Sequence, residues 1–273
     1  MRNLLKIGIA GCGAIGSTLA KTIMSDFSGQ AELSGLYDNN YGKSSGLAFE
    51  LKKRKLAVRS LDELVHKAQL IVEATRAESA FQVASKAIAS SKDVMIMSVG
   101  GILKDYNRLA ALARKRKSCI FIPSGAVCGI DGLKAAGCAR IKKVILTTRK
   151  PPEAFTGNPY MAEKKIRLDK IRKELILFEG NAYQAIKAFP QNINVAATLS
   201  IAGIGAKKTI VRIIAAPKAV RNTHEIEVES DSGKIFTRTE NVIHPKNPKT
   251  SYLAVLSAIA VLKQILEPVK IGT

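Results

Sequence analysis

The chain has 273 residues, more than a typical domain of about 100–150, and 47% of them are hydrophobic, as in globular proteins with a substantial core. No apolar run reaches the ~20 residues of a membrane-spanning helix, and no signal peptide precedes the first apolar segment. The four cysteines form no C-x-x-C pair, and no histidine is spaced to complete a zinc site. These features argue against a membrane, exported or metal-binding protein, and they predict a cytoplasmic chain of two domains with free thiols and no metal.

The net charge of +21 makes nucleic acid the first partner to consider, because basic surfaces attract polyanions. The basic clusters are short, however, as at residues 52–55, 114–117 and 164–165, and they lie in predicted helices or at helix ends. Aromatic residues make up only 5% of the chain and do not alternate with basic ones, as they do in stacking platforms. We interpret the clusters as solvated surface and expect no nucleic-acid partner. A surface adapted to an unusual cytoplasm explains the charge equally well.

Strands and helices alternate over the first 125 residues. Apolar runs predict strands at 6–10, 32–37, 70–74, 94–98 and 119–122. Helical spacing predicts helices at 14–24, 44–55, 61–66, 78–90 and 106–115. Strands joined by helices of this length form right-handed crossovers, so the pattern predicts a Rossmann-type α/β domain with a doubly wound parallel sheet.

The pattern changes after residue 125. Strands are predicted at 142–148, 175–178, 209–215, 223–230 and 234–238, with a turn at 231–233, and helices at 182–187 and 195–202. A lysine-rich insertion at 151–173 is predicted to be a loop. Fewer intervening helices predict a second, α+β domain at 126–244, for substrate binding and oligomerisation. The apolar helix at 251–266 would expose its apolar residues if alone, so we assign 245–273 to the first domain.

A G-x-G-x-x-G motif at residues 11–16 joins the first predicted strand to the first helix. Gly11 allows a tight turn, Gly13 lets the backbone approach a pyrophosphate, and Gly16 lets the helix lie close to the strand. The pyrophosphate would meet the amides and the positive dipole of the helix start at Ala14 and Ile15. This strand–turn–helix context predicts a nicotinamide dinucleotide as cofactor.

Asp38 ends the second predicted strand, 22 residues after Gly16, where an acidic residue binds the adenosine ribose. A carboxylate repels a 2′-phosphate and so favours NAD. Asn39, Asn40 and Lys43 nevertheless offer partners for that phosphate, so NAD and NADP both remain open.

Among the three histidines, His224 is the candidate for proton transfer. His66 lies in a polar helix, and His244 is predicted to lie in a loop. In strand 223–230 the alternation places His224 with Ile226 and Val228 on an apolar face, opposite three glutamates. An imidazole there has a tunable pKa, but the pattern leaves open a catalytic base and a hydrogen-bonded core histidine.

Small residues and cations end other predicted strands. Ser124, Gly125 and Ala126 follow the last strand of the first domain, where a nicotinamide riboside can pass close to the backbone or the chain can simply turn. Arg149 and Lys150 end a strand of the second domain. They are either clamps for substrate carboxylates or surface charges.

Two segments are distinctive: Phe-Pro-Gln-Asn-Ile-Asn-Val-Ala-Ala-Thr-Leu-Ser at 189–200 and Asn-Pro-Lys-Thr-Ser-Tyr-Leu-Ala at 247–254. Together with segments 9–16, 124–131, 146–150 and 222–226, they resemble the L-aspartate dehydrogenase family, in order over nearly the whole chain. The resemblance implies that His224 is the active-site residue and that Ala126 and Asn194 contact the cofactor. Segments 151–173 and 203–206 are longer than is usual in the family.

The resemblance also implies oxidation of L-aspartate to iminoaspartate with NAD or NADP. The imine is then hydrolysed to oxaloacetate and ammonia or used for quinolinate and pyridine nucleotide synthesis. Lys150, Arg149 and Thr198 are our candidates to bind the dicarboxylate, with Thr147 and Thr148 as further hydroxyls, and we expect a homodimer. The alternatives are a homoserine dehydrogenase-like or dihydrodipicolinate reductase-like enzyme, or a non-catalytic protein that binds NAD or nucleic acid.

Overall fold

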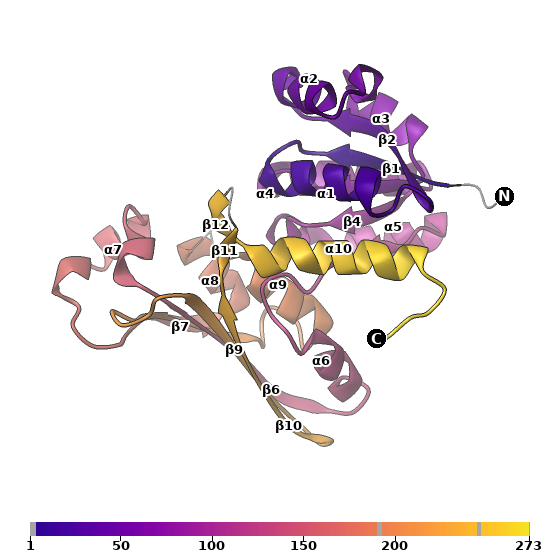
Figure 1. Cartoon of the computed structure of the whole chain (residues 1–273). Helices are drawn as coiled ribbons and strands as arrows, with labels where there is room; N and C mark the ends of the chain where they lie inside the picture. Colours follow the sequence, from indigo (N-terminus) through magenta and orange to yellow (C-terminus); the bar gives the residue numbers. More distant parts are fainter. Residues whose placement is uncertain (1–3, 190–192, 245–246, 273) are drawn as a thin grey trace. The chain divides into compact units, whose positions relative to one another are not determined.

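The computed structural model describes residues 4–189, 193–244 and 247–272, and it divides into two compact units (Figure 1). The first unit comprises Met1–Pro123 and Val255–Ile271, and the second comprises Ser124–Ala254. The domain boundaries expected from the sequence were after residues 125 and 244. Each unit is built on one five-stranded sheet. None of the described helices has the length and apolarity that a membrane crossing requires.

The first unit contains a parallel sheet in the strand order β2-β1-β3-β4-β5. Its strands are β1 (Leu5–Ala10), β2 (Ala31–Tyr37), β3 (Leu70–Glu73), β4 (Asp93–Ile96) and β5 (Ile120–Phe121). Its helices are α1 (Ala14–Ser25), α2 (Tyr41–Glu50), α3 (Leu61–Lys67), α4 (Ala77–Ala89), α5 (Tyr106–Arg116) and α10 (Tyr252–Leu266), with 3-10 turns at Arg54–Leu56 and Val99–Asp105. The predicted doubly wound fold is confirmed.

The central strands of this sheet are apolar throughout because helices cover both faces. Leu70, Ile71 and Val72 of β3 are at most 1% exposed, as expected of buried parallel strands. Ala258 and Leu262 of α10 are buried in the same core cluster as the β1 side chains. The order of the strands reverses between β1 and β3, and ligands of such sheets bind at the carboxyl ends of the two strands at this point.

The second unit contains a mixed sheet in the order β10-β9-β6-β8-β7. Only β6 and β8 pair in parallel among these strands, and the other pairs are antiparallel. The strands are β6 (Ile141–Lys150), β7 (Leu175–Asn181), β8 (Ile210–Ala215), β9 (Asn222–Ser230) and β10 (Gly233–Asn241). The helices are α6 (Ile130–Ala136), α7 (Pro159–Glu163), α8 (Ala182–Ala188) and α9 (Ile193–Ala202), with 3-10 turns at Pro152–Phe155 and Leu168–Lys170. The predicted α+β second domain is confirmed.

This mixed sheet has two different faces. The register sets Thr148 opposite His224 and Arg149 opposite Thr223, so neighbouring residues of β6 and β9 lie on alternate faces. Helix α6 packs against Thr237, which pairs with Ile226 on the His224 side. Figure 1 shows α8 and α9 on the same side of the sheet as α6. We call this the helix-covered face, and the face that carries Arg149 and Thr223 the open face.

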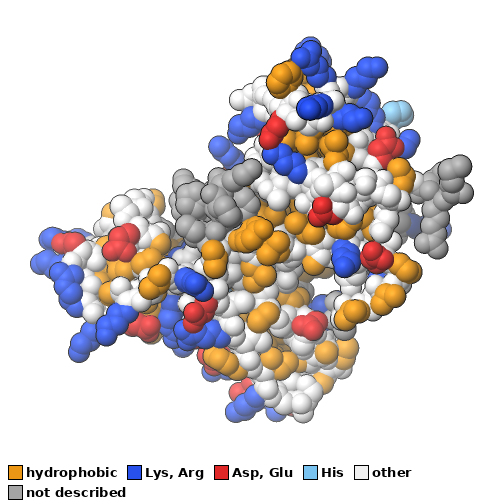
Figure 2. All heavy atoms as spheres, in the orientation of Figure 1, with side chains coloured by type: hydrophobic (Ala, Val, Ile, Leu, Met, Phe, Trp, Pro, Cys, Tyr) orange, Lys and Arg blue, Asp and Glu red, His pale blue; other side chains and the backbone are white. Residues whose placement is uncertain are grey.

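The short basic clusters of the sequence lie at the surface of both units. All the residues of clusters 52–55, 114–117 and 164–165 are exposed. Figure 2 shows lysine and arginine side chains at the surface of each unit, with acidic side chains among them. The clusters are therefore exposed to solvent, as their interpretation as solvated surface requires.

Three parts of the fold differ from the predictions. His244, expected in a loop, lies in β11 (Ile243–His244), which pairs with β12 (Asn247–Ser251). The predicted loop at 151–173 contains α7, capped by Asn158 with Pro159 at its first position, and Tyr160 of α7 packs on two phenylalanine rings. Helix α6 was missed because it is short and contains a glycine, so its helical periodicity is weak.

We expect Gly16→Ala to destabilise the first unit. A Cβ atom at Gly16 would lie 1.9 Å from the carbonyl oxygen of Gly11, so α1 would have to move away from the loop. Such overpacking costs about 1–3 kcal/mol, which denaturant unfolding would measure. Gly46→Ala is the matched control, because its Cβ would meet nothing within 4 Å in helix α2. The control should be neutral or stabilising, and equal losses in both variants would contradict the packing role of Gly16.

Candidate active site

In the glycine loop between β1 and α1, packing within the protein requires glycine at two positions but not at Gly13. Gly11 has a φ of +99°, and a Cβ there would lie 2.3 Å from the carbonyl oxygen of Ala74. The carbonyl oxygen of Gly11 leaves no room for a side chain at Gly16. At Gly13, in contrast, a Cβ would meet nothing within 4 Å, and no side chain caps the start of α1. The open space above Gly13 and the uncapped helix start fit a pyrophosphate.

Asp38 follows β2 and is bonded to the same loop. Its carboxylate accepts one hydrogen bond from the backbone N–H of Cys12 and one from that of Asn40, both 2.9 Å long. Each carboxylate oxygen keeps a lone pair for a ribose hydroxyl. Burial, and after it the charge of Asp38, raise the pKa of the Cys12 thiol to about 12, so the thiol beside the loop stays protonated.

A buried carboxylate joins the carboxyl ends of β3 and β4. Glu73 is 0% exposed, and its Oε1 accepts hydrogen bonds from the Thr75 backbone N–H at 2.8 Å and the Thr75 hydroxyl at 2.6 Å. Its Oε2 accepts one from the Ser98 backbone N–H at 2.9 Å. Glu73 therefore holds together the carboxyl ends of two neighbouring strands, at the edge of the sheet where ligands of such folds bind. Glu73 was not among the predicted site residues. An acidic residue directly after Leu-Ile-Val in a buried strand could have indicated a buried carboxylate with a specific role.

His224 lies on the helix-covered face of the second unit and is 7% exposed. The Thr148 hydroxyl oxygen is 2.9 Å from Nδ1 of the imidazole. Burial, and after it the positive charge of Lys150, lower the pKa of His224 to about 3. The ring is therefore neutral at pH 7, and Thr148 occupies Nδ1, so Nε2 is the nitrogen that can meet a substrate.

Lys150 is on the same face as Thr148, two residues further along β6. Burial lowers the pKa of its ammonium group to about 8. Arg149 projects from the open face instead, where its guanidinium pairs with Glu225 and, at 3.3 Å, with Glu174. Of the two cations predicted to clamp a substrate, the structure brings only Lys150 to the side of His224.

The remaining predicted residues lie around the start of the second unit and on α9. Ala126 is buried, and its carbonyl oxygen accepts a 3.0 Å hydrogen bond from the side chain of Asn241. The Ser251 hydroxyl donates to the other end of that amide at 2.6 Å. Asn194 and Thr198 are four residues apart on one side of α9, with Asn194 exposed and Thr198 buried. Residues 190–192 of the distinctive asparagine-rich segment lie outside the described residues.

Asn241 is a second residue that sequence reasoning missed. It is 4% exposed and links the backbone at Ala126 to Ser251. An asparagine at the end of a polar strand does not by itself indicate a structural or functional role. In the described ranges, no group of three or more His, Cys, Asp or Glu side chains is placed to hold a metal ion.

Comparison with known proteins identifies the family. Residues 11–123 match the model of the homoserine dehydrogenase NAD-binding domain, and residues 131–265 match that of the aspartate dehydrogenase C-terminal domain. The L-aspartate dehydrogenase of Methanosarcina mazei is 48% identical over 272 residues, covering 99% of this chain and 100% of the relative. The chain belongs to the L-aspartate dehydrogenase family. The Methanococcus maripaludis (strain C6) L-aspartate dehydrogenase is 44% identical over 273 residues, again covering 99% and 100% of the two chains.

Solved structures agree on the fold. The aspartate dehydrogenase of Thermotoga maritima superposes with a TM-score of 0.75 at 22% identity, covering 99% of this chain and 100% of that one. A homoserine dehydrogenase from Thiobacillus denitrificans reaches 0.62 at 14% identity, with 96% and 74% covered. The resemblance expected from the sequence is therefore confirmed for the family and for the two-domain fold.

Gly13→Val should weaken cofactor binding and leave the fold intact. The branched side chain would fill the open space above the loop, while the φ of −76° at Gly13 suits any residue. We expect affinity for NADH, measured by fluorescence titration, to fall by at least about tenfold, or about 1.4 kcal/mol. The melting temperature should stay near that of the wild type. A folded Gly13→Val protein with unchanged NADH affinity would contradict this assignment of the loop.

Proposed function

We propose that this protein oxidises L-aspartate to iminoaspartate with a nicotinamide dinucleotide. The observation that carries the proposal is the grouping of Thr148, Lys150 and neutral His224 on one face of the second sheet, in a chain of this family whose first unit has a dinucleotide-type glycine loop. The names of the relatives support L-aspartate as substrate. Iminoaspartate then hydrolyses to oxaloacetate and ammonia or serves quinolinate and pyridine nucleotide synthesis.

The cofactor would be held by the loop from Gly11 to Gly16, by Asp38 and by the backbone at Ala126 and the side chain of Asn194. A bound nicotinamide ring supplies a hydride acceptor. We propose NAD as the preferred form, since the Asp38 carboxylate next to the loop would repel a 2′-phosphate. Asn39, Asn40 and Lys43 are the residues that would allow NADP to be used as well.

His224 acts as the base in this proposal. The substrate enters as an ammonium ion, and only its neutral amine can assist the loss of hydride from the α carbon. A proton therefore moves from the substrate nitrogen to Nε2 of His224, while the Thr148 hydroxyl keeps Nδ1 in place. The two carboxylates of the substrate bring negative charge close to the imidazole, and this raises its pKa from the low value of the unliganded protein.

Lys150 and Thr198 are the proposed partners of the substrate carboxylates. Lys150 lies on the face that carries His224, and a carboxylate would restore the stability of its charged form. The Thr198 hydroxyl forms no hydrogen bond with the described part of the chain and is a donor for the second carboxylate. Arg149 and Thr147 belong to the open face and are not part of this substrate site.

We also propose that the enzyme is a homodimer. The open face of the mixed sheet carries exposed apolar side chains, including Phe236 and Ile176, which are 62% and 53% exposed. Apolar residues on an uncovered sheet face are typical of a protein–protein interface.

A cytoplasmic location fits the four cysteines, which are all free thiols.

The proposed activity predicts a specific substrate profile. NADH or NADPH appearance, followed by absorbance, should be fastest with L-aspartate in a panel that includes D-aspartate, L-glutamate, L-homoserine and L-malate. The ratio kcat/KM should be higher with NAD than with NADP. Faster turnover of L-homoserine than of L-aspartate would refute the substrate assignment and leave the family and the cofactor loop unaffected.

His224→Ala should lower kcat by about 10²–10⁴, the usual contribution of a general base. NADH affinity should not change, because His224 has a chemical role. His66→Ala is the control, since His66 is exposed on α3. Thr148→Val should also lower kcat with little change in KM, whereas Thr148→Ser keeps the hydroxyl and should restore most of the rate. A His224→Ala variant with normal kcat and lower stability would instead identify a structural core histidine.

A further inference from the structure

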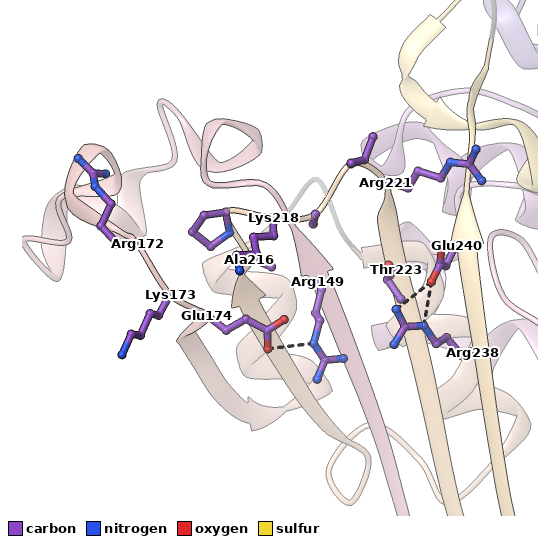
Figure 3. A pocket seen from close by; sticks show the side chains of 13 residues that line it. Arg149, Arg172, Lys173, Glu174, Ala216, Lys218, Arg221, Thr223, Arg238 and Glu240 are labelled. Carbon is purple, nitrogen blue, oxygen red and sulfur yellow. Dashed lines mark hydrogen bonds and ion pairs between the residues drawn. The ribbon is translucent and has the colours of Figure 1, made fainter.

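A cavity of about 810 Å³ lies at one end of the mixed sheet, entirely within the second unit (Figure 3). Its walls come from the end of β6, the segment before β7, the end of β10 and residues 216–221, which join β8 to β9. We call it the basic cavity. Its volume is within the range of small-molecule sites, roughly 300–1,000 Å³.

The basic cavity is lined by six cationic side chains and two carboxylates. The cations are Arg149, Arg172, Lys173, Lys218, Arg221 and Arg238, and the acids are Glu174 and Glu240. Within the described part of the chain, only Arg149 and Arg238 of these six cations form ion pairs. The other four form no ion pair there, so positive charge exceeds negative charge in the cavity, and a concave surface concentrates the resulting potential.

A buried carboxylate fixes the two paired arginines. Glu225 is 8% exposed and accepts hydrogen bonds from Arg149 and, at 3.1 Å, from Arg238. Figure 3 shows Arg149 pointing to Glu174 and Arg238 pointing to Glu240. Since a guanidinium has five N–H donors, both arginines keep donors for a further acceptor. They are therefore ordered in advance, which lowers the entropic cost of binding a ligand.

The basic cavity is separate from the site around His224. Arg149 and Thr223 line it from the open face, whereas Thr148 and His224 lie on the helix-covered face of the same strands. Phe236 and Ile176, the proposed dimer contacts on the open face, are not among its lining residues. The proposed dehydrogenase reaction uses none of the residues that line the cavity.

We propose that the basic cavity binds a small multivalent anion, a compound that carries several phosphate or carboxylate groups. Guanidinium groups match the geometry of both anions through paired N–H donors, and the Lys218 ammonium adds a point charge from the 216–221 segment. Six cations face three carboxylates, Glu174, Glu225 and Glu240, so a monovalent anion would leave part of the net positive charge unneutralised.

Isothermal titration calorimetry with sodium tripolyphosphate, in buffer without divalent cations, tests this proposal. We expect saturable binding that weakens as ionic strength rises, because the cations are solvent-accessible. In the double variant Lys218→Ala/Arg221→Ala, affinity should fall by at least about tenfold. Citrate in a parallel titration distinguishes the source: tighter tripolyphosphate binding indicates a phosphorylated ligand, and tighter citrate binding indicates a polycarboxylate.

Two controls separate this site from general attraction and from the cofactor loop. The double variant Lys207→Ala/Lys208→Ala removes the same charge as Lys218→Ala/Arg221→Ala. Its two residues are exposed and precede β8, at the end of that strand away from the cavity. This variant should bind tripolyphosphate as tightly as the wild type. Gly13→Val, and saturating NAD, should leave the binding unchanged. Equal weakening in both double variants, or loss of binding with Gly13→Val or NAD, would overturn the proposal. So would a wild-type dimer that binds no anion and dissociates in Lys218→Ala/Arg221→Ala, because the cavity would then be a subunit interface.

Discussion

The register between β6 and β9 decides what each face of the second sheet can do. It places Thr148 opposite His224 and Arg149 opposite Thr223. A shift of one residue would bring Arg149 beside His224 and send Thr148 to the open face. The register is held by apolar side chains on the helix-covered face, such as Leu146 and Ile226, each 1% exposed. The packing of the core thus positions the histidine and its hydroxyl partner, and the same alternation directs the arginines into the basic cavity.

The two units build their parts of the proposed enzyme in opposite ways. In the first unit the cofactor loop depends on the absence of side chains, since Gly11 and Gly16 are required by backbone contacts and Gly13 leaves space for a ligand. Asp38 and Glu73 then hold the neighbouring strand ends through backbone N–H groups. In the second unit the site depends on which side chains share a face. Backbone amides suit a pyrophosphate common to many dinucleotides, whereas side chains suit one particular substrate.

Local patterns in the sequence were sufficient for most of the fold and for part of the site. Periodicity located the strands of both sheets, and alternation alone placed His224 on the face opposite its neighbouring glutamates. The hydrogen-bond partners of these residues could not be predicted in this way, because Thr148 and His224 are 76 residues apart and no local pattern links them. The contact of Arg149 with Glu225 spans the same distance in sequence. The basic cavity gathers side chains from positions 149 to 240, so composition revealed the charge but not its location.

The folded state loses stability by burying Lys150 beside His224. The pKa of Lys150 falls from 10.5 to about 8, so below pH 8 its burial costs about 3 kcal/mol relative to the unfolded chain. That cost is relieved as pH rises from 8 to 10.5, where the folded protein has already released the proton. His224 adds an acid limit, because below about pH 6.5 the unfolded chain binds a proton that the folded protein excludes down to about pH 3. Both costs would shrink with the proposed dicarboxylate substrate bound nearby, since its charge would stabilise the lysine ammonium and the protonated imidazole. Two groups that weaken the protein without substrate would thus become favourable partners of the proposed substrate, and perturbed pKa values of this kind are typical of functional sites.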